Sequence, residues 1–135
     1  MRKGPYNYFR KSLHTIAEVL EHVEMTSTKK DIMIIDGDPI KIGSDRYKIF
    51  KFKGLKCVKC DLEAQYFAKE CSGGKIISWH MNLYAINADG REVLFTKDHI
   101  YPKSLGGKNE FDNYQPMCSI CNCDKGSKVE TIIVE

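Results

Sequence analysis

Two Cys-x-x-Cys pairs, Cys57–Cys60 and Cys118–Cys121, stand far apart in this sequence and suggest that distant segments are joined. Tetrahedral zinc binds thiolates at about 2.3 Å, and a CxxC turn presents two of them from one short loop. Four cysteine ligands leave no open coordination position. We therefore expect a structural zinc that closes the segment between residues 57 and 121; the alternative is a set of buried thiols without a metal. The two remaining cysteines are expected to be free thiols: Cys71 and Cys123.

The length and composition set the context for these cysteines. The chain has 135 residues, six cysteines and a formal net charge of +3. This length favours one domain with a modest core. No apolar run is long enough to cross a membrane, and the basic N-terminus lacks the apolar stretch of a signal peptide. We expect a cytosolic, reducing environment without a membrane partner, in which cysteines bind metal and do not form disulfides.

Apolar periodicity predicts the elements of the N-terminal part. Apolar residues at helical spacing predict an amphipathic helix over residues 12–25 with Ser12 as its N-cap. Segments 32–35 and 40–42 flank Asp-Gly-Asp-Pro and indicate a short hairpin. Residues 47–52 (YKIFKF) indicate a third strand leading to the first cysteine pair. Residues 63–71 are compatible with a helix or a strand.

The pattern after residue 77 is clearer. Segments 78–86 and 92–100 are apolar and β-branched, and Asn87-Ala88-Asp89-Gly90 between them predicts a β-hairpin turn. A polar loop follows, then a short strand at 113–117. The last predicted element is a short helix over about 119–125, ended by Gly126.

An ordered set of motifs lies between and across the cysteine pairs. Asp98-His99 is followed by Pro102, Gly106-Gly107 and Asn113, and Cys118–Cys121 is followed at once by Asn122 and then by Lys125-Gly126. This set closely resembles the zinc-stapled branch of the HNH endonuclease family, which is widespread in bacteriophages. The resemblance covers residues 57–128.

The resemblance implies an α+β fold. Its centre would be a ββα-metal core stapled by the four-cysteine zinc site, with an N-terminal helix and short strands beside it. It divides the chain into an extension at 1–56, a nuclease core at 57–128 and a tail at 129–135.

The chemistry of the motif fits hydrolysis of a phosphodiester, which needs an activated water and a Lewis acid. His99 is suited to be the general base, because the ordinary pKa of histidine lies near 6.5. Asp98 is a hard oxygen ligand for a catalytic Mg²⁺ or Mn²⁺, and the Asn122 carbonyl is a candidate second ligand. Cys121 and Asn122 diverge by roughly 100° on a helix and can face different metals. Lys125 shares the face of Asn122 and is expected to meet a phosphate.

By resemblance, Asn113 holds the catalytic histidine through its amide and backbone, although asparagine also suits a simple turn there. Asn122 stands where the name-giving pattern has a second histidine, so this chain has an HNN form. Because adjacent strand residues point to opposite faces, Asp98 and His99 share a site only if the strand ends or bulges there.

Basic residues suggest where substrate binds. The segment 41–60 carries seven cations against one acid, and we expect Lys48, Lys51 and Lys53 to contact phosphates; a solvated strand edge is the alternative. Lys103 is assigned to the substrate as well. A turn centred on residues 88–89 would place Ser78, Trp79 and His80 beside the active site, although Trp79 and His80 also suit packing positions.

These features predict a metal-dependent DNA endonuclease whose products, by resemblance, carry 5′-phosphate and 3′-hydroxyl ends. Double-stranded DNA is the favoured partner, although no residue of the motif reads a 2′-hydroxyl and RNA stays open. One alternative is a non-catalytic zinc-binding nucleic-acid module. Another is a structural adaptor, for instance in phage DNA packaging. The oligomeric state stays open, a dimer included.

Overall fold

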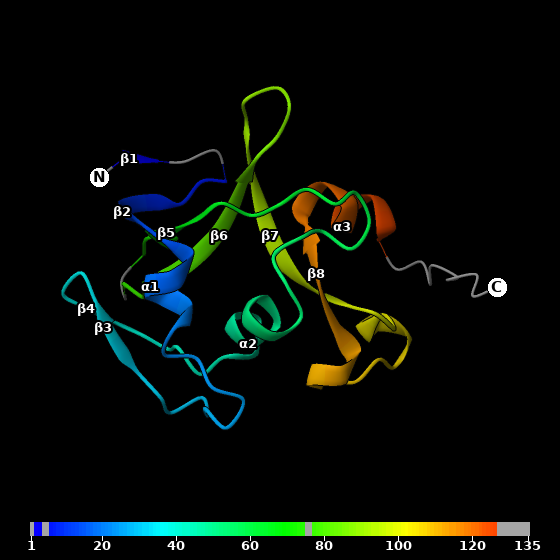
Figure 1. Ribbon diagram of the computed structural model, residues 1–135, viewed down its shortest axis with the longest axis horizontal. Helices are drawn as coiled ribbons and strands as arrows, with labels where there is room; N and C mark the ends of the chain where they lie inside the picture. The colour runs from blue at the N-terminus through cyan, green and yellow to red at the C-terminus, as the bar shows by residue number, and fades with distance from the viewer. Residues whose placement is uncertain (1, 4–5, 75–76, 127–135) are drawn as a thin grey trace.

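The computed structural model describes residues 2–3, 6–74 and 77–126, and the expected tail at 129–135 lies outside these ranges. The described residues form eight strands, three α-helices and two short 3-10 helices (Figure 1). The strands are β1 (Arg2–Lys3), β2 (Phe9–His14), β3 (Met33–Ile35), β4 (Asp38–Ile40), β5 (Tyr66–Cys71), β6 (His80–Ile86), β7 (Glu92–His99) and β8 (Tyr114–Cys118). The helices are α1 (Ile16–Leu20), α2 (Asp45–Phe52), η1 (Lys103–Leu105), η2 (Phe111–Asn113) and α3 (Ser119–Lys125).

Six strands form one antiparallel sheet in the order β1-β2-β5-β6-β7-β8, and β3-β4 is a separate hairpin. β7 has two different partners along its length. Its first residues pair with β6, where Leu94 lies opposite Tyr84, and its last residues pair with β8, where His99 lies opposite Tyr114. The sheet therefore passes from the N-terminal strands to the C-terminal pair through this one strand.

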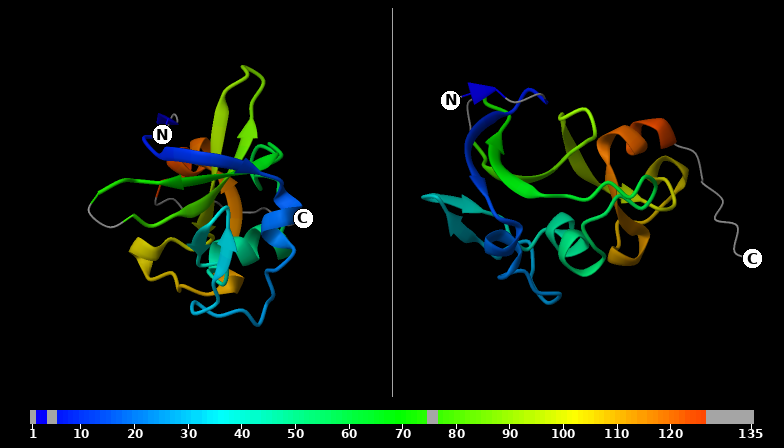
Figure 2. Two further views of the ribbon diagram at one scale, coloured as in Figure 1. Left: turned by 90° about the vertical axis from the view of Figure 1, so that its left-hand side faces the viewer. Right: turned by 45° about the horizontal axis from the view of Figure 1, so that its top comes forward.

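The predicted hairpin around residues 87–90 is confirmed. The Asn87 side-chain oxygen accepts hydrogen bonds of 3.0 Å from the backbone N–H groups of Asp89 and Arg91. Gly90 has a φ of 77°, a conformation in which a side chain would be strained. The turn extends beyond the rest of the sheet in Figure 1 and in the left view of Figure 2.

The predicted helix over residues 12–25 is wrong in its first part and too long. Residues 9–14 form β2, whose backbone pairs with β5, so residues 63–71 hold a strand. The helix spans only Ile16–Leu20, and its N-cap is Thr15, not Ser12. Thr15 and Glu18 form a reciprocal capping box, which fixes the start of the helix after the strand ends.

The predicted strand at 47–52 is also wrong, because this segment is α2. Tyr47 and Phe50 lie one helical turn apart, and both place their rings against Phe67, with centroid distances of 6.2 and 6.4 Å. The Phe50 ring also meets Phe95 of β7 edge-on at 6.5 Å. The segment is too short for its apolar periodicity to distinguish a helix from a strand, and packing against these strands selects the helix.

The remaining predicted elements are present. The predicted 32–42 hairpin is present with a shorter turn, Asp36-Gly37, whose φ values of 49° and 81° suit a two-residue turn. Asp38 and Pro39, predicted to lie between the strands, belong to β4, and residues 41–42 lie outside it. β8 and α3 stand where the strand and helix were predicted, and Gly126 follows α3.

The hydrophobic core is shared by the two parts of the chain on either side of residue 57. Val19 of α1 and Ile49 of α2 are fully buried in the same cluster as Phe67, Leu83 and Met117. The fold is therefore of mixed α+β class, with helices from both parts covering one sheet. None of the described helices has the length and apolar character needed to cross a bilayer.

Candidate active site and metal centre

The four cysteines of the two CxxC pairs lie together, as predicted. Their Sγ atoms are all within 4.8 Å of one another, and those of Cys60 and Cys118 are 3.8 Å apart. A tetrahedron with zinc–sulfur bonds of about 2.3 Å has edges of about 3.8 Å, so this spacing fits a zinc ion. All six cysteines are free thiols, including Cys71 and Cys123.

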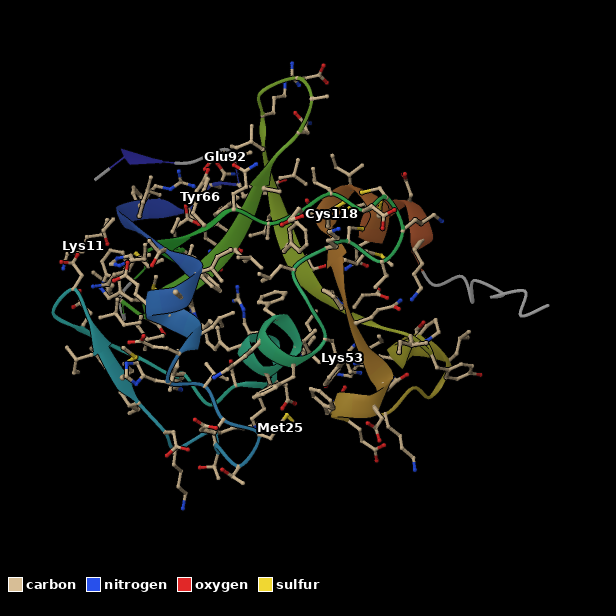
Figure 3. The ribbon with its side chains drawn as sticks, viewed as in Figure 1. Lys11, Met25, Lys53, Tyr66, Glu92 and Cys118 are labelled. Atoms are coloured by element: carbon tan, nitrogen blue, oxygen red, sulfur yellow. The ribbon has the colours of Figure 1, made fainter. Side chains whose placement is uncertain are left out.

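The backbone around the thiols brings the two pairs together. The Cys57 N–H donates to the Leu62 carbonyl at 2.9 Å, which closes the first loop. The next N–H, that of Val58, donates to the Pro116 carbonyl at 3.1 Å and ties this loop to β8. Cys118 is the N-cap of α3, and its sulfur accepts from the Cys121 N–H at 3.5 Å. Figure 3 shows Cys118 where β8 meets α3.

The chemistry of the thiols also fits a cation. Burial acts to raise the pKa of Cys57, but the backbone N–H groups of Cys118, Cys60 and Lys59 outweigh it and lower this pKa to about 7. Burial raises the pKa of Cys121 far above its ordinary value, and the neighbouring thiols raise it further. Four thiolates this close repel one another, and a divalent cation relieves that repulsion.

A second, polar site lies at the end of β7. A cavity of about 170 Å³ opens there, and Asp98, His99, Lys103 and Asn122 all line it. The strand ends at His99, so its last two side chains both reach this cavity from opposite faces. Asp98 and His99 were expected to share a site only if the strand ended or bulged there. The strand ends there, and it does not bulge, because β7 pairs with β8 through His99 without a break in register.

Asp98 is a buried carboxylate with 5% exposure. Its Oδ2 accepts hydrogen bonds from Lys125 Nζ at 2.6 Å and from Gln115 Nε2 at 2.9 Å. Both of these donors approach the same oxygen. Among the described residues, Oδ1 has no hydrogen-bond donor, so a cation in the cavity could bind it.

Asn122 is held in one orientation by its neighbours. Its Nδ2 donates to Thr96 Oγ1 at 2.8 Å, and that hydroxyl donates to the Met117 carbonyl at 2.8 Å. Because the amide nitrogen is bound to Thr96, the carbonyl oxygen of Asn122 is available to a ligand in the cavity. The preceding residue, Cys121, contributes instead to the thiol cluster.

His99 contacts two residues of the loop and of β8. Its Nε2 lies 2.8 Å from the Asn109 Oδ1, and its ring meets the Tyr114 ring edge-on at 5.0 Å. A carbonyl oxygen is only an acceptor, so Nε2 carries the proton in this contact and Nδ1 is left as the basic nitrogen. Nothing in the sequence motif distinguished Asn109 from other loop residues.

Residues 87–134 match the HNH endonuclease family. No curated protein and no solved structure matches the chain. The HNH segment contains Asp98, His99, Asn122 and the second cysteine pair, whereas the first pair comes from outside it.

The Asn113 side chain binds the loop that follows His99, and its predicted role in holding the histidine stays a prediction. Its Oδ1 accepts from the Tyr101 N–H at 2.9 Å, and its Nδ2 donates to the carbonyls of Tyr101 and Lys108 at 3.1 and 2.8 Å. The Asn113 amide therefore holds the loop that follows His99, and the side-chain partner of the imidazole is Asn109.

The structure also corrects the phosphate role predicted for Lys125. This side chain is 2% exposed. Its ammonium group binds Asp98 and also donates to the carbonyls of His99 and Ile100 at 2.6 and 3.4 Å. A buried ammonium with these acceptors stabilises the end of β7 and cannot reach a substrate.

Lys48 and Lys51 of α2, and Lys53 directly after it, bind carbonyl groups of the chain. Lys48 donates to the Ser27 carbonyl at 2.5 Å and Lys51 to that of Val23 at 2.7 Å. Lys53 donates to two carbonyls near β8, at 2.6 Å each, and Figure 3 shows it directed toward that segment. These bonds give the three ammonium groups a structural role, and their predicted contact with phosphate stays a prediction.

The placement of Ser78, Trp79 and His80 beside the active site is wrong. β6 pairs with β7 only as far as Tyr84 opposite Leu94, and His80 lies opposite Glu70 of β5 instead. Trp79 packs on the hydrophobic core. The prediction assumed that the pairing of β6 with β7 continues from the turn to residue 78. It stops earlier, because β7 leaves β6 and pairs with β8.

Proposed function

We propose that this chain is a metal-dependent endonuclease that hydrolyses phosphodiester bonds of DNA. One observation carries the proposal: Asp98, His99 and Asn122 line one polar cavity within the segment that matches the HNH family. The pair β7–β8 with α3 would then be the ββα-metal core. The thiol cluster would hold a structural zinc beside it, and its four sulfurs support this assignment.

His99 is the proposed general base. Its contact with Asn109 supports a tautomer in which Nδ1 accepts the proton of the attacking water. The edge of the Tyr114 ring and the β8 ladder fix the position of the imidazole. A positioned base of this kind typically contributes about 10²–10⁴-fold to the rate.

Asp98 and Asn122 would hold the catalytic Mg²⁺ or Mn²⁺ through Asp98 Oδ1 and the Asn122 carbonyl. Such an ion, when bound, stabilises negative charge on the phosphate and on the leaving 3′-oxygen. Lys125 positions Asp98 by holding Oδ2, and Thr96 orients the amide of Asn122. Lys103, an exposed residue at the rim of the cavity, is the proposed contact to the reacting phosphate.

The test is nicking of supercoiled plasmid DNA by the zinc-loaded chain with Mg²⁺. His99→Ala should lose activity, whereas His22→Ala should retain it, because His22 is exposed, pairs with Glu21 and does not line the cavity at the end of β7. A non-catalytic zinc-binding module would bind DNA and leave the plasmid intact with every variant.

A further inference from the structure

A second hollow, a groove of about 550 Å³, lies beside the candidate active site. Lys97, His99 and Lys103 line both the groove and the smaller cavity, so the two are continuous through these side chains. Lys97 and His99 share one face of β7, and Asp98 points to the other face, toward α3. The groove therefore leads to His99 from the side of the strand opposite the buried Asp98–Lys125 pair.

The far wall of this groove comes from the N-terminal part of the chain. It includes the first turn of α2 and residues of earlier loops, among them Tyr8, Lys29 and Arg46. These segments precede residue 87 and lie outside the part that matches the HNH family. The N-terminal part of the chain thus forms one wall of the groove, and this wall is not covered by the match to the HNH family.

The charges around the groove are unbalanced. Four cationic side chains line it against a single acid, Asp45. None of these cations forms a salt bridge with any described residue: Lys29, Arg46, Lys97 and Lys103. A set of like charges held together in this way is complementary to an anion.

Two of the cations are fixed in place by the structure behind them. Arg46 donates to the Met81 carbonyl at 3.1 Å and to Asn82 Oδ1 at 2.8 Å. Asn82 is itself held by the fully buried Glu70, at 2.9 Å. Lys97 lies with its ammonium 4.2 Å from the centre of the Tyr114 ring. Such preorganised cations lose little conformational entropy when an anionic ligand binds.

We propose that the groove binds the DNA backbone to one side of the bond that is cut, with Lys97, Arg46 and Lys29 contacting its phosphates. This inference rests on the proposed function, because the groove opens at His99. It makes the N-terminal wall a substrate-binding part and places the phosphate contacts here instead of on Lys48, Lys51 and Lys53.

Fluorescence anisotropy with a labelled DNA duplex, at several salt concentrations and without Mg²⁺, tests the proposal. Lys29→Met and Lys97→Met should each weaken binding to all sequences. Each should also reduce the slope of log affinity against log salt by roughly 0.9, the value for one lost phosphate contact on duplex DNA. Lys30→Met is the matched control, because Lys30 is the next residue of the same exposed loop and does not line the groove.

The outcomes separate this proposal from the proposed function. If Lys29→Met and Lys97→Met keep the wild-type slope while the wild-type chain cuts DNA, the groove assignment is wrong and the nuclease stands. If the wild-type chain binds DNA and the two slopes fall without any cutting, the groove stands and the nuclease assignment fails. Lys29 is exposed on a loop, so its variant reports even if Lys97→Met fails to fold.

Discussion

Lys125 Nζ lies 2.6 Å from Asp98 Oδ2, and both side chains are almost completely buried. This pair connects α3 to the end of β7 just where the candidate catalytic residues stand. Removing one partner of a buried ion pair leaves an unpaired charge in the interior, which typically costs about 3–5 kcal/mol. Asp98 therefore has a role in stability as well as its proposed role as a metal ligand.

Substitution of either partner should thus affect folding. We expect Lys125→Met and Asp98→Ala each to lower the free energy of unfolding by about 3–5 kcal/mol. Asp98→Asn should cost less, because an amide oxygen still accepts the Lys125 hydrogen bond. Its nicking activity should fall and recover in part as Mg²⁺ is raised, since a ligand is weakened and the base is intact. Denaturant unfolding measures the first effect, and an Asp98→Ala chain as stable as wild type would contradict it.

The thiol cluster predicts one tightly bound zinc per chain. Cys118→Ser should lose the metal and unfold the C-terminal half, because structural zinc contributes folding free energy directly. Cys123→Ser is the matched control: Cys123 lies on the same helix, is exposed and is not part of the cluster. Its zinc content should be normal. A well-folded wild-type chain without zinc by elemental analysis would rule out this site.

Zinc binding should also depend on pH in a defined direction. The pKa of Cys121 is raised, mainly by burial, so zinc must displace its proton when it binds. Affinity should therefore increase with pH and be lost on acidification. Competition with a chromophoric chelator between pH 6 and pH 8 measures this, and a pH-independent affinity would show that the thiols are not the ligands.

Asn109 should act on catalysis through His99. Loss of one neutral hydrogen bond is worth about 1 kcal/mol, so Asn109→Ala should reduce the nicking rate by about fivefold without loss of zinc. Asn109→Asp places a negative charge beside the imidazole and should raise the pKa of His99. The acidic limb of the pH–rate profile would then shift to higher pH. By contrast, Asn113→Ala should chiefly destabilise the loop, because its amide binds Tyr101 and Lys108.

Substitution of Lys53 tests whether this lysine has a structural role or contacts phosphate. Its two carbonyl acceptors predict that Lys53→Met lowers the free energy of unfolding by about 1–3 kcal/mol. The salt slope of DNA binding should stay the same. Lys56→Met, which alters an exposed lysine on the following loop, should change neither quantity. A slope reduced by roughly 0.9 in Lys53→Met would instead support the phosphate contact expected from the sequence.

Local chemistry explains which elements could be predicted from the sequence. The Asn87–Gly90 turn and the CxxC spacing encode their own geometry within a few residues, and both are found as predicted. The Thr15–Glu18 capping box is also formed by neighbouring residues, but the apolar spacing of residues 13–23 led to a prediction of a longer helix that begins at Ser12. The sequence of residues 47–52 wrongly predicted a strand, because contacts with Phe67 and Phe95, which are distant in the sequence, select the helix.

For the candidate site, the sequence predicted which residues lie together better than it predicted their contacts. Asp98, His99 and Asn122 share a cavity, as the spacing suggested. Lys125 was expected at the substrate because the helical pattern gives the face of a residue and not its burial. Asn109 was missed because an irregular loop brings it to His99. Arg46 and Lys29 belong to segments whose approach to β7 is decided by the tertiary fold.

The most direct test of the nuclease assignment is the rate of plasmid nicking in Mg²⁺ by wild type and His99→Ala, both loaded with zinc. We expect wild type to nick DNA and His99→Ala to be slower by about 10²–10⁴-fold. Zinc content and DNA affinity should be equal in the two proteins, and raising Mg²⁺ should not restore the variant, because metal does not replace a missing base. A His99→Ala chain that nicks as fast as wild type would contradict the account.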